Sequence, residues 1–121
     1  MLQLSTEETL VLLGREYDFY QRIFEITKLE GLELSKHLPS FSQIKQYSNK
    51  KNIIFSCIEE IEKQVKEQGN RKDADPKIKL FMIKLRGLVK GILKLDEENQ
   101  QLFTQIILLL NQEKNMASPE N

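Results

Sequence analysis

The side chains best suited to chemistry in this chain are a histidine and a glutamate that stand four residues apart. His37 is the only histidine of the sequence, and Glu33 would lie on the same face of a helix. A structural zinc site needs about four ligands and a catalytic one about three, and no second histidine or nearby cysteine completes the set. We therefore expect His37 to be a surface residue near a helix C-terminus, with no metal and no cofactor bound.

One cysteine and one group of carboxylates could take part in catalysis. Cys57 would need a base, and nothing in the sequence places His37, the only candidate, beside it. A cysteine next to an apolar stripe is usually a small buried side chain. Glu59, Glu60 and Glu62 could imitate an acid/base pair, but a helical wheel places most of them on the solvated side. The sequence therefore predicts no catalytic residue and no enzyme.

Basic side chains are concentrated in the segment 77–94, where they could contact nucleic acid. They are Lys77, Lys79, Lys84, Arg86, Lys90 and Lys94. Acidic residues follow at once at 96–98, and the aromatic residues that stacking would need fall on the apolar stripe instead. Over the whole chain 18 basic side chains balance 18 acidic ones. We expect the lysines to flank the core and to pair with the acidic segment 1–40, without a nucleic acid partner.

Length and composition predict a single helical domain. The chain has 121 residues, of which 40% are hydrophobic and 30% charged, so it can bury a modest core. Three prolines and five glycines favour a few long helices, and hence an all-α fold. A single cysteine excludes an intramolecular disulfide and fits the cytoplasm. We expect no signal peptide and no membrane insertion, because no apolar stretch approaches about 18 residues.

A capping box marks the start of the first of three helices. Ser5 can accept a bond from the amide of Glu8, and Glu8 can reach back to the amide of Ser5, so this helix should occupy about 6–37. Two adjacent apolar series follow, which are Leu10, Leu13, Tyr17, Tyr20 and Phe24, and Leu12, Phe19, Ile23 and Ile26. Together they make a face wide enough for two neighbouring helices.

The second helix should follow the break at Pro39 and occupy about 41–68. Ser40 with Gln43 repeats the cap pattern. The heptad series of this helix contains one charged residue, Lys51, and we expect its stem to lie along apolar surface while its ammonium group reaches water.

The third helix should be the longest. The polar segment 69–76 predicts a loop, Asp75 is a good N-cap, and Pro76 suits the first helical position, so the helix should occupy about 76–112. The tail 115–121 is expected to be disordered. The three helices predict one domain, 1–121, with the architecture of an elongated antiparallel three-helix bundle with coiled-coil-like heptad packing.

The third helix contains a long heptad series in which one member is polar. The series is Ile78, Phe81, Leu85, Leu88, Ile92, Leu95, Asn99, Leu102, Ile106 and Leu109. Asn99 could fix the register of the helices at some cost in stability. Alternatively, the series beyond Asn99 is not ordinary core, because two shorter helices would leave part of it exposed for a partner. The candidate partner-binding residues are Asn99, Leu102, Phe103, Ile106, Leu109 and Leu110.

Three segments of the chain resemble the FlgN family of flagellar export chaperones. They are Lys28-Leu29-Glu30-Gly31-Leu32, then Lys51 with Ile54, Ile58, Glu59, Glu60, Ile61 and Glu62, and Glu98-Asn99-Gln100-Gln101-Leu102-Phe103. The resemblance spans most of residues 7–112. The chain departs from the family in its Leu38-Pro39 break, its polar loop 69–76 and its short tail.

The resemblance implies a small cytoplasmic helical chaperone that acts on proteins. In that family the C-terminal helical region receives C-terminal helical segments of hook–filament junction subunits, prevents their early assembly and delivers them to the type III export apparatus. Carried over to this chain, it implies that Leu102, Ile106, Leu109 and Leu110 face the substrate. A chaperone of needle-type secretion systems would look much the same.

Two functions therefore follow from the sequence. The first is an export chaperone whose third helix covers an amphipathic helix of a flagellar or type III secretion substrate. The alternative is a structural helical-bundle subunit that forms a homodimer or a larger assembly through the same C-terminal heptad series.

Overall fold

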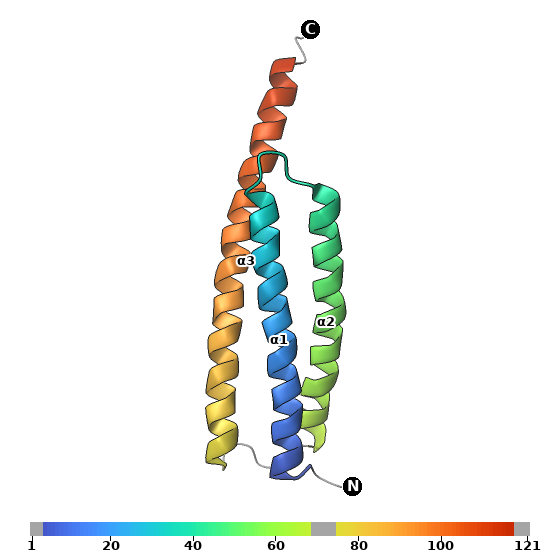
Figure 1. Ribbon diagram of the computed structural model, residues 1–121, viewed down its shortest axis with the longest axis vertical. Coiled ribbons are helices and arrows are strands. Elements are labelled where there is room, and N and C mark those ends of the chain that lie inside the picture. Colours follow the sequence, from blue (N-terminus) through green and yellow to red (C-terminus); the bar gives the residue numbers. More distant parts are fainter. Residues whose placement is uncertain (1–3, 69–74, 118–121) are drawn as a thin grey trace.

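The computed structural model describes residues 4–68 and 75–117, and every regular element in these ranges is a helix (Figure 1). The helices are α1 (Thr6–Leu34), α2 (Phe41–Gln68) and α3 (Pro76–Ala117). They run up, down and up, so α2 is antiparallel to the other two helices. The all-α three-helix bundle predicted from the sequence is confirmed.

α1 begins with the capping box that the sequence indicates. The Ser5 hydroxyl accepts a hydrogen bond from the amide of Glu8 at 3.0 Å, and Glu8 Oε1 accepts one from the amide of Ser5 at 2.8 Å. The bond from the Ser5 amide holds the pKa of Glu8 below its ordinary value. The amides of Ser5 and Glu8, which have no partner within the helix, are thereby satisfied.

The C-terminal end of α1 differs from the expected end at residue 37, because the helix stops at Leu34. The Glu33 carboxylate accepts hydrogen bonds from the amide of Ser40 at 2.8 Å and from the ammonium of Lys36 at 2.9 Å. These bonds lower the pKa of Glu33, and the bond from the Ser40 amide has the largest effect. They draw the connection 35–40 back over the end of α1, so the helix cannot continue to His37.

The starts of α2 and α3 lie at the expected residues. The Ser40 hydroxyl accepts from the amide of Gln43 at 3.1 Å, and Asp75 Oδ1 accepts from the amide of Lys77 at 2.8 Å. Pro76 occupies the first position of α3, where its missing N–H has no cost. The predicted loop 69–76 otherwise lies outside the described residues.

α3 is longer than expected. It reaches Ala117 and has 42 residues, so residues 115–117 of the predicted disordered tail are helical. Neither Gly nor Pro occurs between the end of the heptad series and Ser118, so no helix-breaking residue precedes the end of α3. Residues 118–121 of the predicted tail lie outside the described part of the chain.

The core consists of two clusters stacked along α1. The first contains the buried residues Leu13, Ile78 and Leu85, and the rings of Tyr17 and Phe81 meet edge to face beside it at 6.0 Å. In the second cluster each helix contributes one buried isoleucine, and these residues are Ile23, Ile58 and Ile92. The wide apolar face of α1 packs on both other helices, whereas the backbones of α2 and α3 come close to each other at few of their described positions.

Polar residues occupy part of the most buried stripe of α1. Thr9, Glu16, Thr27 and Glu30 are all buried. The Thr27 hydroxyl donates to the carbonyl of Ile23 at 2.7 Å, whereas the Thr9 hydroxyl has no hydrogen-bond partner among the described residues. Such a group costs roughly 1–3 kcal/mol. The sequence patterns missed this stripe because it lies between the two apolar series.

Negative charge also surrounds a tyrosine of α1. The Tyr20 hydroxyl donates to Glu62 Oε2 of α2 at 3.4 Å. Burial, followed by the charges of Glu62 and Glu16, raises the pKa of Tyr20 to about 12. Tyr20 therefore stays a hydrogen-bond donor between α1 and α2 throughout the physiological pH range.

None of the helices in the ranges 4–68 and 75–117 is both long enough and apolar enough to cross a membrane.

Candidate protein-binding site

α3 extends beyond the ends of α1 and α2 (Figure 1). The rings of Phe103 and of Phe41, the first residue of α2, meet edge to face at 5.9 Å and mark the level at which the bundle ends. We call residues 104–117 of α3 the overhang. At 1.5 Å per residue it is about 21 Å long.

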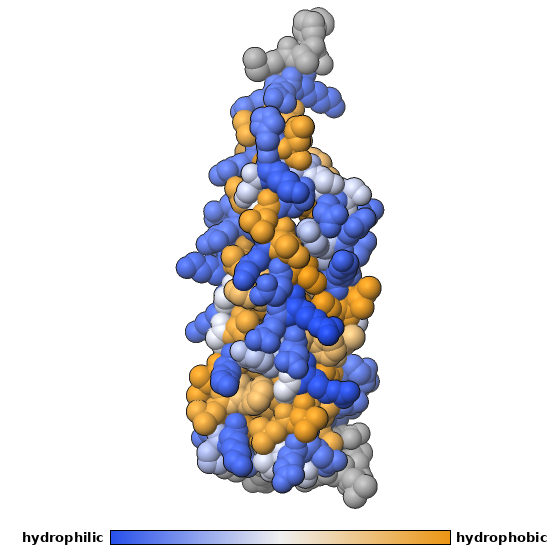
Figure 2. Space-filling view, in the orientation of Figure 1, coloured by the Kyte–Doolittle hydropathy of each residue, from blue (hydrophilic) through white to orange (hydrophobic). Residues whose placement is uncertain are grey.

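The overhang exposes aliphatic side chains on all sides. Ile107, Leu108, Leu109 and Leu110 are 38%, 55%, 60% and 45% exposed, and Ile106 before them is half-buried. Five successive residues point in five directions because each turns the helix by about 100°. Apolar side chains are visible among the polar ones on the upper, narrow part of the molecule (Figure 2). A helix that is apolar all round is normally buried in a protein.

Burial along the heptad series of α3 falls toward the C-terminus. Ile78, Leu85 and Ile92 are buried, Asn99, Leu102 and Ile106 are half-buried, and Leu109 is exposed. Phe103 is also half-buried. Three of the six candidate residues, Asn99, Leu102 and Phe103, therefore lie within the bundle. The other three lie in the overhang, where Ile106 is half-buried and Leu109 and Leu110 are exposed.

A layer of polar side chains lies just below the overhang. Lys51 Nζ of α2 donates to Glu30 Oε1 of α1 at 2.6 Å and to Asp96 Oδ1 of α3 at 3.2 Å. Asn99 Nδ2 of α3 donates to the carbonyl of Thr27 at 2.9 Å. We call these five residues the polar layer. Because each helix supplies at least one partner, the layer fixes the relative register of the helices.

The expectation for Lys51 was wrong. Its ammonium group is bound within the polar layer instead of projecting into solvent, and its side chain is only 12% exposed. Glu30 and Asp96 were missed as its partners, because nothing local connects residues that lie 21 and 45 positions away in the sequence. The signal in the sequence was the lone charge in an apolar heptad series.

Asn99 also lies against a glycine. A Cβ atom added to Gly31 would come within 2.8 Å of Asn99 Oδ1, closer than van der Waals contact allows. Gly31 therefore lets α1 and α3 approach closely where Asn99 binds the Thr27 carbonyl.

Gly87 and Gly31 provide a matched test, because an added Cβ atom has free space at Gly87 and meets Asn99 at Gly31. We expect Gly87→Ala to raise the free energy of unfolding by about 0.5–1 kcal/mol, because alanine favours a helix. The Cβ atom that this substitution adds at position 87 has no neighbour within 4 Å among the described residues, apart from its own stretch of helix. We expect Gly31→Ala to give no gain, because Asn99 must move and lose its bond to Thr27. Urea unfolding followed by circular dichroism compares the two, and equal stabilisation would contradict the close packing at Asn99.

A groove of about 400 Å³ opens between α2 and α3 beside the polar layer. Its walls are Ile44, Ser48, Asn52 and Phe55 of α2 and Asp96, Asn99, Gln100 and Phe103 of α3. Glu30, Leu34 and Lys51 complete the lining. The lining combines apolar side chains such as Phe55 and Phe103 with amide side chains such as Asn52 and Gln100.

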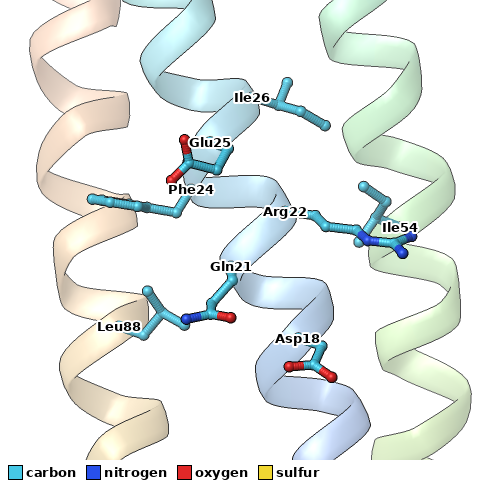
Figure 3. Close-up of a pocket in the computed structure, with 8 residues that line it drawn as sticks. All are labelled: Asp18, Gln21, Arg22, Phe24, Glu25, Ile26, Ile54 and Leu88. Carbon is cyan, nitrogen blue, oxygen red and sulfur yellow. The ribbon is translucent and has the colours of Figure 1, made fainter.

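A second hollow of about 770 Å³ runs over the outer side of α1 (Figure 3). Leu88 of α3 lies on one side and Ile54 of α2 on the other. The carboxylates of Asp18 and Glu25 and the guanidinium of Arg22 point in different directions. These charged groups do not converge on a common point, so this hollow offers no arrangement for catalysis.

The residues that could bind a metal or act in catalysis do not lie together in the structure. His37 is exposed in the connection 35–40, while Glu33 bonds Ser40 and Lys36 instead. Cys57 is half-buried on α2. Among the described residues no group of three or more histidine, cysteine or acidic side chains could hold a metal ion.

No protein family model, no curated protein and no solved structure matches the chain. The resemblance to the FlgN family therefore rests on its three short segments alone.

Proposed function

We propose that this protein is a cytoplasmic export chaperone that binds an amphipathic helical segment of a flagellar or type III secretion substrate. The overhang is the observation that supports it, because Ile107 to Leu110 are exposed on the part of α3 that extends beyond the ends of α1 and α2 (Figure 1). Covering such side chains with a partner's apolar face stabilises a complex by about 1.5–3 kcal/mol for each one fully buried. The bound segment is thereby kept from assembling early.

The client class comes from the resemblance to the FlgN family. It comprises the C-terminal helical segments of hook–filament junction subunits, and a component of the export apparatus would receive the complex. An overhang with few charges suits such clients, since Glu113 and Lys114 are its only charged residues.

The test uses a double variant, Leu109→Asp with Leu110→Asp. Purified C-terminal segments of hook–filament junction proteins from the same organism are titrated in a calorimeter. We expect the wild-type protein to bind one of them and the variant to bind it at least about 100-fold more weakly, because two buried apolar contacts are lost. Both residues lie outside the core, so the circular dichroism and the melting temperature should not change.

The matched control is Val11→Asp with Leu80→Asp. Both residues are as exposed as Leu109, but Val11 lies near the start of α1 and Leu80 near the start of α3. These helix starts are at the end of the molecule opposite the overhang (Figure 1). This control should bind like the wild type. Equal affinity of the overhang variant and the wild type, or no binding of any segment by the wild type, would refute the proposal.

The alternative function is a structural subunit that forms a homodimer through the overhang, since a second copy could cover the same side chains. Light scattering at increasing protein concentration separates the two functions. A stable dimer that Leu109→Asp with Leu110→Asp converts to a monomer would favour the structural subunit, and a monomer at all concentrations would exclude it.

A further inference from the structure

The three helices leave one corner of a four-helix arrangement empty. Gly31 of α1 lies against Asn99 of α3, whereas the preceding residue, Glu30, pairs with Lys51 of α2. Successive residues of a helix point about 100° apart, so α2 and α3 lie on two sides of α1 that are nearly at right angles. Because the backbones of α2 and α3 come close to each other at few of their described positions, the groove between them occupies the fourth corner.

The face of α3 that lines this groove continues into the overhang. Asp96, Gln100 and Phe103 line the groove, and the same spacing of four and three residues leads on to Ile107 and Leu110. Residues at this spacing share one face of a helix. A helix lying in the groove would therefore stay in contact with the overhang without changing direction, over about 21 Å from Asp96 to Leu110.

The charge of the groove indicates the chemistry of its occupant. Glu30, Lys51 and Asp96 are the only charged residues among those that line it, and they sum to a net charge of −1. Glu30 and Lys51 are 10% and 12% exposed, whereas Asp96 is 40% exposed. Lys51 lies closer to Glu30, so the uncompensated negative charge faces the groove at Asp96.

We propose that the partner segment lies in this groove as a fourth helix, continues along the overhang, and places a lysine or arginine opposite Asp96. This inference rests on the proposed function, because it names the path and the charge of the segment that the overhang binds. The apolar residues of the segment would contact Phe55 and Phe103 in the groove and Ile107 and Leu110 beyond it.

The probes are two fluorescently labelled 21-residue peptides with leucine at heptad a and d positions and with alanine and glutamine elsewhere. They differ only in one central residue, which is arginine in one peptide and glutamine in the other. Fluorescence anisotropy should show that the wild-type protein binds the arginine peptide about five-fold more tightly, as expected for one partly buried ion pair.

Asp96→Asn should abolish this five-fold preference, so that the variant binds the two peptides with equal affinity. The matched control is Glu97→Gln, which removes the same charge from the next residue, an exposed one, and should retain the preference. Phe55→Glu, on the α2 wall, should weaken the binding of both peptides by at least ten-fold. Thermal melting confirms that each variant is folded.

Three results would overturn the fourth-helix position. They are equal affinity of the two peptides for the wild type, a preference that survives Asp96→Asn, and no binding of either peptide. Each of these leaves the proposed function standing if Leu109→Asp with Leu110→Asp still abolishes binding of the junction segments. If instead that double variant binds the junction segments normally, the proposed function fails and the groove assignment fails with it.

Discussion

Replacing Lys51 by alanine is expected to lower the free energy of unfolding by about 3–5 kcal/mol, the cost of removing one partner from a buried ion pair. The Glu30 carboxylate would remain in a site where it is only 10% exposed, without the ammonium that now lies 2.6 Å away. Urea unfolding at neutral pH, followed by circular dichroism, measures the effect. The control is Lys50→Ala, an exposed neighbour on the same helix, which should change stability by less than about 0.5 kcal/mol.

A double variant shows whether the loss comes from the unpaired carboxylate. Lys51→Met combined with Glu30→Met removes both charges and leaves apolar groups of similar length, so most of the stability should return. Asp96 keeps contact with water in this variant because it is 40% exposed. A loss after Lys51→Ala no larger than after Lys50→Ala would show that the polar layer does not hold the bundle together.

Replacing Ile23 by alanine is expected to cost about 3 kcal/mol of stability, within the range for aliphatic residues cut back to alanine in a core. Ile23 is fully buried where the three helices meet, and it packs with Ile58 and Ile92. Because neighbours on three helices surround it, the cavity cannot close by the movement of one side chain. Differential scanning calorimetry measures the shift in melting temperature.

The same substitution at an exposed site provides the control. Ile53 on α2 is 67% exposed, so Ile53→Ala should change stability by less than about 0.5 kcal/mol. A difference between Ile23→Ala and Ile53→Ala of less than about 1 kcal/mol would contradict the packing of the second core cluster.

The helix starts could be predicted because their causes are local. Ser5 with Glu8, Ser40 with Gln43, and Asp75 before Pro76 each act within three residues, and each makes the bond that its position in the sequence indicates. The end of α1 could not be predicted in this way. It depends on a bond between Glu33 and the amide of Ser40, seven residues away across a connection whose path the sequence does not specify.

The candidate site was partly predictable for a similar reason. The heptad series already made the third helix the longest of the three, and α1 and α2 have 29 and 28 residues against 42 in α3, so the part of α3 that exceeds them projects. The residue at which shielding ends is set by the contact between Phe41 and Phe103, which joins two helices. The partners of Lys51 also come from other helices, which is why a solvated ammonium was expected where an ion pair lies.

The overhang has a consequence for the kinetics of recognition. Starting a helix is the slow and unfavourable step of its formation, whereas adding residues to an existing one is fast. The bundle holds the residues of α3 up to Phe103 in helical form. They act as a permanent nucleus from which the helix over residues 104–117 can form again after it has unfolded locally. An arriving segment thus meets a template that re-forms within about a microsecond. The rate of capture should accordingly be limited by the ordering of the incoming segment and not by that of α3.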